Sequence, residues 1–306
     1  MSWLSFRALL PWALAGAVTG VTGVTGCADP ASQSEGPPID HCFSCPAVGP
    51  PSDAPAAPLL ITDRGADGVF RYSLDGHLVA QVAGATDAAL RRPSETRRGP
   101  DGALYISSFG DNVIHRLDAG EATTFFGSSA LEEPTTLFFA DRDLYVLGND
   151  TQNVVVIDPA GTLVAEVATE LRGAHDMALG PDGLLYVATA ASLGEPGCLQ
   201  VWDPDLGERV AVFGAELERA TALAFDAGGD LYVADYDAGA IHRYDPVARR
   251  WEATVATGLA SPLDLAFDGA GRLHVLTERG VERLDDGALL IPIGPPLERP
   301  RSLTFL

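Results

Sequence analysis

Apolar and polar residues alternate in short runs along the chain, and one of these runs recurs six times. Each copy begins with Leu and continues with residues that favour strands, most often as Leu-Tyr-Val. The copies stand at 59–61, 104–106, 144–146, 185–187, 231–233 and 273–275, which makes the spacing between them 40 to 46 residues. A repeat of roughly 40–45 residues built from short strands is typical of a β-propeller blade. The pattern predicts an all-β fold, a six-bladed β-propeller over residues 58–306.

The repeat at 221–255 shows how one blade divides into four strands. Apolar, β-branched and aromatic residues fill 221–225, 231–235, 240–244 and 251–255, and Asp, Gly and Pro occupy the turns between them. Strands of about five residues separated by such turns are the expected signal of a sheet of short strands.

The two ends of the chain predict how the ring closes. The first repeat starts at 59–61, which reads as the second strand of a blade whose first strand is missing. The last residues, 300–305 (Pro-Arg-Ser-Leu-Thr-Phe), read as a first strand with nothing after it. Together they make one complete blade and cover edges that an open stack would expose. We expect blade 1 to be closed by the N- and C-terminal strands.

The charge of the chain excludes one class of partner. Its 306 residues carry a formal net charge of −22, and all 20 basic residues are arginine. Nucleic-acid binding needs a basic patch that releases counterions, so we expect no nucleic-acid partner. Many acids lie in turns such as 99–102 (Gly-Pro-Asp-Gly), where Asp and Gly serve the backbone geometry. We interpret the acidity as a soluble surface and expect a monomer.

The first 57 residues have the composition of a targeting segment and a spacer. Arg7 precedes an apolar run at 8–18, and 24–27 (Val-Thr-Gly-Cys) resembles a bacterial lipobox. This predicts a signal peptide at 1–26, a lipidated Cys27 and a place in the cell envelope; the alternative is ordinary signal cleavage near Ala28. Residues 27–57 are rich in proline and predict a disordered tether to the membrane.

The tether contains Cys42 and Cys45 in a Cys-x-x-Cys pattern. A thioredoxin-like role needs a βαβ context, haem attachment needs a histidine after the second cysteine, and zinc needs a fourth ligand. In an exported protein we expect a Cys42–Cys45 disulfide, which leaves Cys198 free. The alternative is that Cys198 pairs with one of the two.

Three segments carry a family resemblance that spans nearly all of 58–306. They are 111–118 (Asp-Asn-Val-Ile-His-Arg-Leu-Asp), 180–188 (Gly-Pro-Asp-Gly-Leu-Leu-Tyr-Val-Ala) and 229–235 (Gly-Asp-Leu-Tyr-Val-Ala-Asp). These motifs resemble those of the NHL-repeat and related six-bladed propeller families. The resemblance implies the fold. It implies no single activity, because such families include protein-interaction modules, lactonases, lyases and ligand binders.

The six predicted first strands line a central channel, and their starts align. The third aligned position holds Glu95, Asp176 and Asp264 on alternate blades. Three carboxylates around one axis are the hard oxygen ligands that suit Ca²⁺ or Mg²⁺, so they are a candidate metal site. The alternative is that each carboxylate caps its own turn or pairs with an arginine.

In the predicted first strand of blade 2, Arg97 and Arg98 stand where the first strands of the other blades carry mostly apolar residues. Arginines on an inner strand are costly unless they are paired or face the channel. They are interpreted either as an ion-pair plug with Glu95 and Asp176 or as a fork that binds an anionic ligand.

Three further residues are candidates for the channel mouth. The segment around His175 resembles the region of streptogramin-cleaving lyases that supplies a histidine near the mouth, which makes His175 a candidate catalytic residue. The alternative is a structural histidine. Metal lactonases of the gluconolactonase type place Glu, Asn and Asp around the axis. The third aligned position of the strand starts in this sequence lacks Asn, which departs from that pattern. Phe109 and Tyr236 lie in loops after second strands and are candidates for contact with a ligand.

Two functions are consistent with this sequence. The first is a membrane-tethered, exported propeller that binds a protein, a glycan or a small molecule at the channel mouth. The second is a divalent-metal-dependent, lactonase-like hydrolase or lyase. The sequence shows no complete set of nucleophile, base and orienting group, which favours the binding module.

Overall fold

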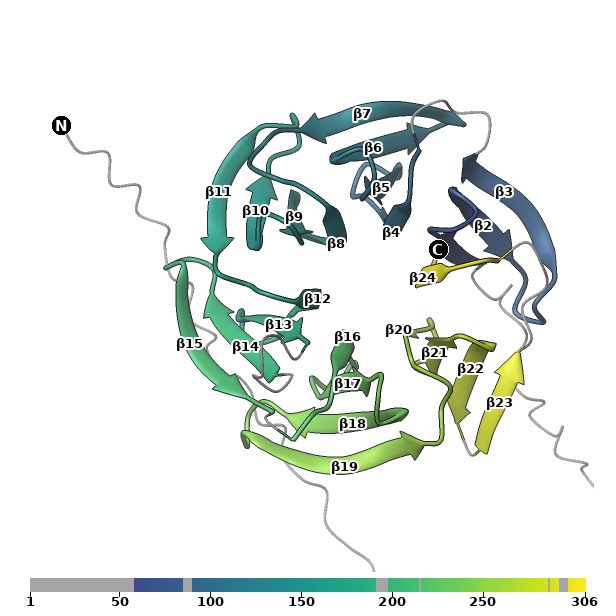
Figure 1. Cartoon of the computed structure of the whole chain (residues 1–306), viewed down its shortest axis with the longest axis vertical. Coiled ribbons are helices and arrows are strands. Elements are labelled where there is room, and N and C mark those ends of the chain that lie inside the picture. Colours follow the sequence, from purple (N-terminus) through teal and green to yellow (C-terminus); the bar gives the residue numbers. More distant parts are fainter. Residues whose placement is uncertain (1–57, 85–89, 191–197, 215, 286, 292–296) are drawn as a thin grey trace, which may run out of the picture. The chain divides into compact units, whose positions relative to one another are not determined.

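The computed structural model describes residues 58–84, 90–190, 198–214, 216–285, 287–291 and 297–306. Within these residues, 24 strands form six four-stranded antiparallel sheets. The sheets stand as blades around one axis, with each first strand innermost and each fourth strand outermost (Figure 1). The predicted all-β, six-bladed propeller is confirmed.

The strands follow the chain in order around the ring. Blade 1 contains β24 (Pro300–Phe305), β1 (Leu59–Asp63), β2 (Gly68–Tyr72) and β3 (Leu78–Gly84). Blade 2 contains β4 (Pro93–Arg98), β5 (Leu104–Ser108), β6 (Val113–Asp118) and β7 (Glu121–Gly127). Blade 3 contains β8 (Pro134–Ala140), β9 (Asp143–Gly148), β10 (Asn153–Ile157) and β11 (Leu163–Ala168).

Blades 4 to 6 repeat the same arrangement. Blade 4 contains β12 (Ala174–Leu179), β13 (Leu185–Thr189), β14 (Cys198–Asp203) and β15 (Glu208–Phe213). Blade 5 contains β16 (Ala220–Phe225), β17 (Leu231–Asp235), β18 (Ala240–Asp245) and β19 (Arg250–Thr257). Blade 6 contains β20 (Asp264–Phe267), β21 (Leu273–Thr277), β22 (Gly280–Asp285) and β23 (Gly287–Ile291). The six recurring apolar runs are the second strands.

The ring closes through the last strand of the chain. β24 pairs antiparallel with β1, so that Phe305 lies opposite Leu59 and Leu303 lies opposite Ile61. β24 also contacts β4 and β20, the first strands on either side. The predicted closure of blade 1 by the two ends of the propeller is therefore confirmed.

Apolar side chains fill the spaces between neighbouring blades. One cluster joins Leu147 and Val156 of blade 3 to Met177 and Val187 of blade 4. All five residues of β13 are buried, whereas β15, at the outer edge of the same blade, is largely exposed. Because neighbouring sheets cover both faces of the second strands, each of these strands contains a short apolar run.

Many of the acids shape turns, as their sequence pattern suggested. Asp182 accepts hydrogen bonds from the Leu184 amide at 3.1 Å and from the Tyr186 hydroxyl at 2.9 Å. Asp101 makes the same two contacts, with the Ala103 amide and the Tyr105 hydroxyl. These carboxylates therefore fix turns between strands.

Several predictions on the N-terminal part lie outside the described residues. They are the signal peptide at 1–26, the lipidated Cys27, the tether at 27–57 and the Cys42–Cys45 disulfide. Cys198, at the start of β14, makes no disulfide with a described residue, and its Sγ lies 3.1 Å from Thr189 Oγ1. A search of the described residues found no helix that is long and apolar enough to span a membrane.

Candidate functional site

A β-bulge at the start of the first strands turns extra side chains into the channel. In β12, Ala174 pairs with Thr189 and Asp176 pairs with Ala188, so His175 is the additional residue. β24 has the same irregularity, because Pro300 and Ser302 pair with adjacent residues of β1 and leave Arg301 additional. A bulge re-aims side chains that strict alternation would send to the other face. Two successive residues of a strand therefore line the channel mouth.

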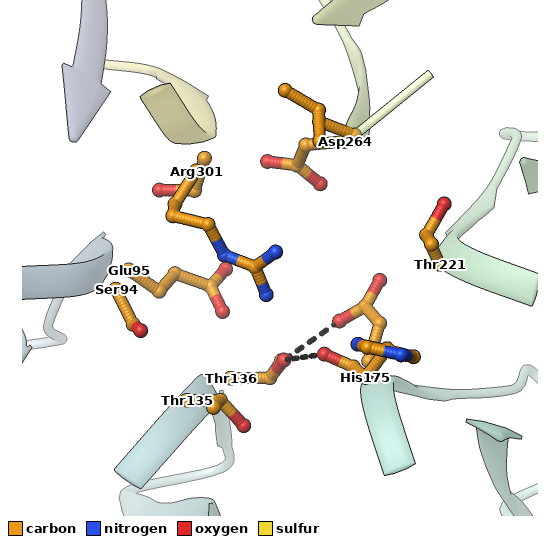
Figure 2. A pocket seen from close by; sticks show the side chains of 11 residues that line it. Ser94, Glu95, Thr135, Thr136, His175, Thr221, Asp264 and Arg301 are labelled. Atoms are coloured by element: carbon orange, nitrogen blue, oxygen red, sulfur yellow. Dashed lines mark hydrogen bonds between the residues drawn. The ribbon is translucent and has the colours of Figure 1, made fainter. Parts of the chain in front are cut away.

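A small cavity with a volume of about 20 Å³ lies at this mouth, and residues from all six blades line it (Figure 2). Its lining follows the aligned strand starts. The second aligned position contributes Ser94, Thr135, His175, Thr221, Leu263 and Arg301. The third contributes Glu95, Thr136, Asp176, Asp264 and Ser302. The structure thus brings together the predicted site residues Glu95, His175, Asp176 and Asp264.

The three acids link neighbouring blades in pairs. Glu95 Oε2 accepts the Leu137 amide of blade 3 at 3.0 Å. Asp176 Oδ2 accepts the Leu223 amide of blade 5 at 2.6 Å, and Asp264 Oδ2 accepts the Leu303 amide of blade 1 at 2.7 Å. All three carboxylates are buried. Each one therefore stabilises the junction with the next blade by satisfying a backbone donor that water cannot reach.

The remaining carboxylate oxygens are also occupied. Asp176 Oδ1 accepts the Thr136 hydroxyl at 2.9 Å and the Met177 amide at 2.8 Å, and Asp264 Oδ1 accepts the Leu265 amide at 2.8 Å. Among the described residues, no group of three or more His, Cys, Asp or Glu side chains is arranged to hold a metal ion. The Ca²⁺ or Mg²⁺ site therefore stays a prediction. Of the alternative, in which each carboxylate caps its own turn or pairs with an arginine, the structure shows the pair of Glu95 with Arg97, and it adds the contacts to the next blade.

Burial raises the pKa of all three acids. It raises the pKa of Glu95 to about 8, although the Arg97 charge opposes the rise, and the charges of Asp176 and Asp264 add to it. Burial likewise raises the pKa of Asp264 to about 7, and the Asp176 charge adds to it. The pKa of Asp176 is raised by the same burial. Close carboxylates in a site of low polarity disfavour the charged form of one another.

Arg97 and Arg98 have different places. Arg97 Nη2 forms an ion pair with Glu95 Oε1 at 2.5 Å, and Nη1 donates to Thr304 Oγ1 at 3.1 Å. Arg98 is exposed at the end of β4 and does not line the mouth cavity. Of the two interpretations, the ion-pair plug fits Arg97, and the structure does not bring Arg98 to the site.

His175 stands in a positive environment. Burial, and then the charges of Arg301, Arg219 and Arg64, lower the pKa of His175 to about 4. The imidazole is therefore neutral at pH 7. Its ring makes no hydrogen bond with a described residue, so in this part of the chain it lacks the orienting partner that a general base requires.

Phe109 and Tyr236, the two aromatic residues predicted to contact a ligand, each pack against arginine side chains near the mouth. Two guanidinium groups lie over the ring of Phe109, that of Arg64 at 4.1 Å and that of Arg92 at 4.7 Å from the ring centroid. Arg64 also donates to the hydroxyl of Ser94, which lines the cavity. Tyr236 carries Arg219 at 4.1 Å from its ring centroid. Cations over aromatic faces stabilise both groups and fix the position of the guanidinium.

Sequence reasoning missed Arg64, Arg219 and Arg301 as site residues. Arg301 is the one arginine in the second aligned position of the six strand starts, and this position was the available signal for it. Arg64 and Arg219 lie next to strands, and only their stacking on Phe109 and Tyr236 turns them toward the mouth. A search for arginine near the loop aromatics was the available signal.

The raised pKa values predict that the protein loses stability as the pH rises above neutral. The unfolded chain has already released the protons of Glu95 and Asp264 at pH 7, whereas the folded chain releases them near pH 8 and 7. The free energy of unfolding should therefore fall by about 2 kcal/mol between about pH 7 and about pH 8.5. Urea unfolding at both pH values measures it. In Asp264→Asn the fall should be smaller, and a flat profile of the unmodified protein would contradict the prediction.

Comparisons with known proteins show the fold. No family model and no curated protein matches the sequence. A streptogramin B lyase structure aligns with a TM-score of 0.59 at 16% identity, covering 74% of this chain and 75% of the other. A catalytically inactive virginiamycin B lyase from Staphylococcus aureus, crystallised with quinupristin, aligns with a TM-score of 0.58 at 20% identity, covering 72% and 74%.

A chain in the crystal structure of a nidogen/laminin complex aligns with a TM-score of 0.65 at 17% identity, covering 81% of this chain and 97% of the other. At these identities the likeness concerns the fold alone, and the resemblance to NHL repeats remains an expectation. With six sheets around one axis and a ring closed by β24, the chain is a six-bladed β-propeller that resembles virginiamycin B lyase and the nidogen-complex propeller.

Proposed function

We propose that this protein is a membrane-tethered, exported binding module that takes its ligand at the channel mouth. One observation carries the proposal: the second aligned position of the six first strands holds six residues of varied chemistry, and all of them line the cavity. The deeper third position is largely committed to blade junctions. Varied polar groups that a rigid scaffold holds around one opening are typical of a recognition site.

The propellers of similar fold support this proposal only in general terms. One was crystallised with quinupristin, and another comes from a nidogen/laminin complex. Proteins of this fold thus occur together with different kinds of binding partner. The lipobox at Cys27 and the proline-rich tether support a location in the cell envelope, where the mouth meets exported or external ligands.

One observation favours the enzymatic alternative, a hydrolase or lyase. His175 lines the mouth and has a lowered pKa, so a neutral imidazole faces the cavity at pH 7. A neutral histidine is the form that accepts a proton from a substrate. The described residues offer neither an orienting group for this ring nor a metal-binding group, and for this reason the binding module is preferred.

A substitution that fills the cavity at the mouth tests this proposal. Leu263→Trp enlarges a half-buried lining residue, and Leu206→Trp makes the same change at a residue that is 68% exposed on an outer turn. Full-length protein is screened by thermal unfolding against neutral sugars, peptides and organic acids. A ligand at about one hundred times its Kd stabilises by about 2.7 kcal/mol, which raises the melting temperature by about 5 °C.

The expected result is a ligand that raises the melting temperature of the unmodified protein and of Leu206→Trp but not of Leu263→Trp. Equal shifts in all three proteins would contradict a site at the mouth. The same assay with Ca²⁺, Mg²⁺ or Zn²⁺, with and without chelator, tests the metal alternative. Lactone or ester turnover that is lost in His175→Ala would replace the binding module with the enzyme.

A further inference from the structure

We propose that the mouth recognises a carboxylate group on its ligand, with Arg301 and Ser302 as the donors that contact it. This inference rests on the proposed function, because it names the chemistry that the same mouth selects. Both residues belong to β24, and the bulge described above turns them together into the cavity. Figure 2 shows the Arg301 side chain reaching into the cavity from its strand.

Both donors lack a partner in the described part of the chain. The Arg301 guanidinium makes no hydrogen bond and no ion pair with any described residue. Ser302 is 5% exposed, and its Oγ is buried without a hydrogen-bond partner. Buried polar groups are normally hydrogen-bonded, and an unused donor in a cavity indicates a missing acceptor. A carboxylate supplies acceptors to a guanidinium and a hydroxyl at once.

Arginine charges reach the mouth beside its acids. Arg301 lines the cavity, and its charge acts on His175 together with the charges of Arg64 and of Arg219, which also pairs with Asp237. Burial, followed by the charges of Arg301 and Arg92, lowers the pKa of Arg64 to about 9. Cations crowded in this way repel one another, and a bound anion relieves that repulsion.

The acids below the mouth do not serve as the missing anion. Their oxygens accept hydrogen bonds from backbone amides and Thr136, and Glu95 also pairs with Arg97. No ion pair joins one of them to Arg301 within the described residues. Burial lowers the pKa of Arg301, and the charges of the three acids oppose this effect.

The size of the cavity limits what enters it. About 20 Å³ is close to the space that one water molecule needs, so the deep part of the mouth admits only a terminal group of a few atoms. A carboxylate is among the smallest such terminal groups. The rest of the ligand must lie farther out, near Phe109 and Tyr236 with their stacked arginines.

Matched pairs of acids and amides test this inference on the full-length protein. The probes are phenylacetate and phenylacetamide, glucuronate and glucuronamide, and an N-acetyl dipeptide with a free or an amidated C-terminus. They separate an aromatic acid, a uronic acid and a peptide terminus as sources of the same group. Affinities are measured by calorimetry at low ionic strength, where exposed charges are least screened. At least one acid should bind about tenfold or more tightly than its amide.

Arg301→Gln should abolish this preference and Ser302→Ala should weaken it. Arg98→Gln, which removes the same charge outside the mouth, should leave it unchanged. Acids that bind no better than their amides, or a preference that survives Arg301→Gln, would overturn the inference, and so would the absence of any acid binding up to roughly 10 mM. If neutral ligands still bind and Leu263→Trp abolishes this binding, the proposed function stands although the preference for a carboxylate is wrong. Acid binding that Leu263→Trp does not affect would contradict both.

Discussion

Replacing Asp63 with alanine is expected to lower the free energy of unfolding by about 4 kcal/mol. Asp63 ends β1 and is completely buried. Its carboxylate accepts the amides of Gly65 at 2.7 Å and Ala66 at 2.9 Å in its own turn. It also accepts the amides of Glu298 at 2.6 Å and Arg299 at 3.0 Å, which lead into β24. Alanine leaves these buried donors without acceptors where the ring closes.

Urea unfolding measures this loss, and amide hydrogen exchange at Glu298 and Arg299 locates it. The matched control is Asp158→Ala, because Asp158 accepts the amides of Ala160 and Thr162 at 2.9 and 2.8 Å within one exposed hairpin. Water replaces the lost acceptor there, so the control should cost less than about 1 kcal/mol. If both variants lose the same stability, Asp63 has no special role in closing the ring.

Arg97→Met should cost about 3 kcal/mol at about pH 8.5, since it removes the counter-charge of a buried carboxylate, which must then take up a proton to remain buried. Arg97 pairs with Glu95, and its charge is what opposes the rise in the pKa of that carboxyl. Without Arg97, the pKa of Glu95 should rise further. Near pH 6 the carboxyl of the unmodified protein is itself protonated and makes no charged pair with Arg97, so the cost of the substitution should shrink as the pH falls.

Arg98→Met is the control for this experiment. It removes the same charge from the next residue, which is exposed and has no ion pair within the described residues, so its effect should stay below about 0.5 kcal/mol at both pH values. A cost of Arg97→Met that is independent of pH would show that Arg97 contributes by packing and not by charge.

The fold could be predicted from the sequence because its signal repeats. Six copies of one apolar run predicted the blades, and two incomplete repeats predicted that the last strand closes blade 1, where β24 pairs with β1. In blade 5, the expected strand at 231–235 coincides with β17, and the one expected at 251–255 lies within β19 (Arg250–Thr257). Repetition averages out the local ambiguity that weakens the reading of a single strand.

The site could be predicted only in part. Aligning the strand starts identified Glu95, Asp176 and Asp264 as neighbours of the axis, but it did not show that their oxygens are occupied by amides of the next blade. Those partners are 39 to 47 residues away in sequence. The orientations of Arg301 and His175 depend on bulges, which break the two-residue period on which a strand prediction relies.

The alternation of acids around the axis has a consequence for the number of blades. At the third position Glu95, Asp176 and Asp264 belong to blades 2, 4 and 6, and the smaller Thr136, Ala222 and Ser302 belong to blades 3, 5 and 1. The propeller is thus assembled from three couples, each locked by one carboxylate. In a ring with an odd number of sheets this alternation would break, because two neighbouring blades would both carry an acid at the third position or would both lack one. The strict alternation of locked and unlocked junctions is therefore available only to a ring with an even number of blades.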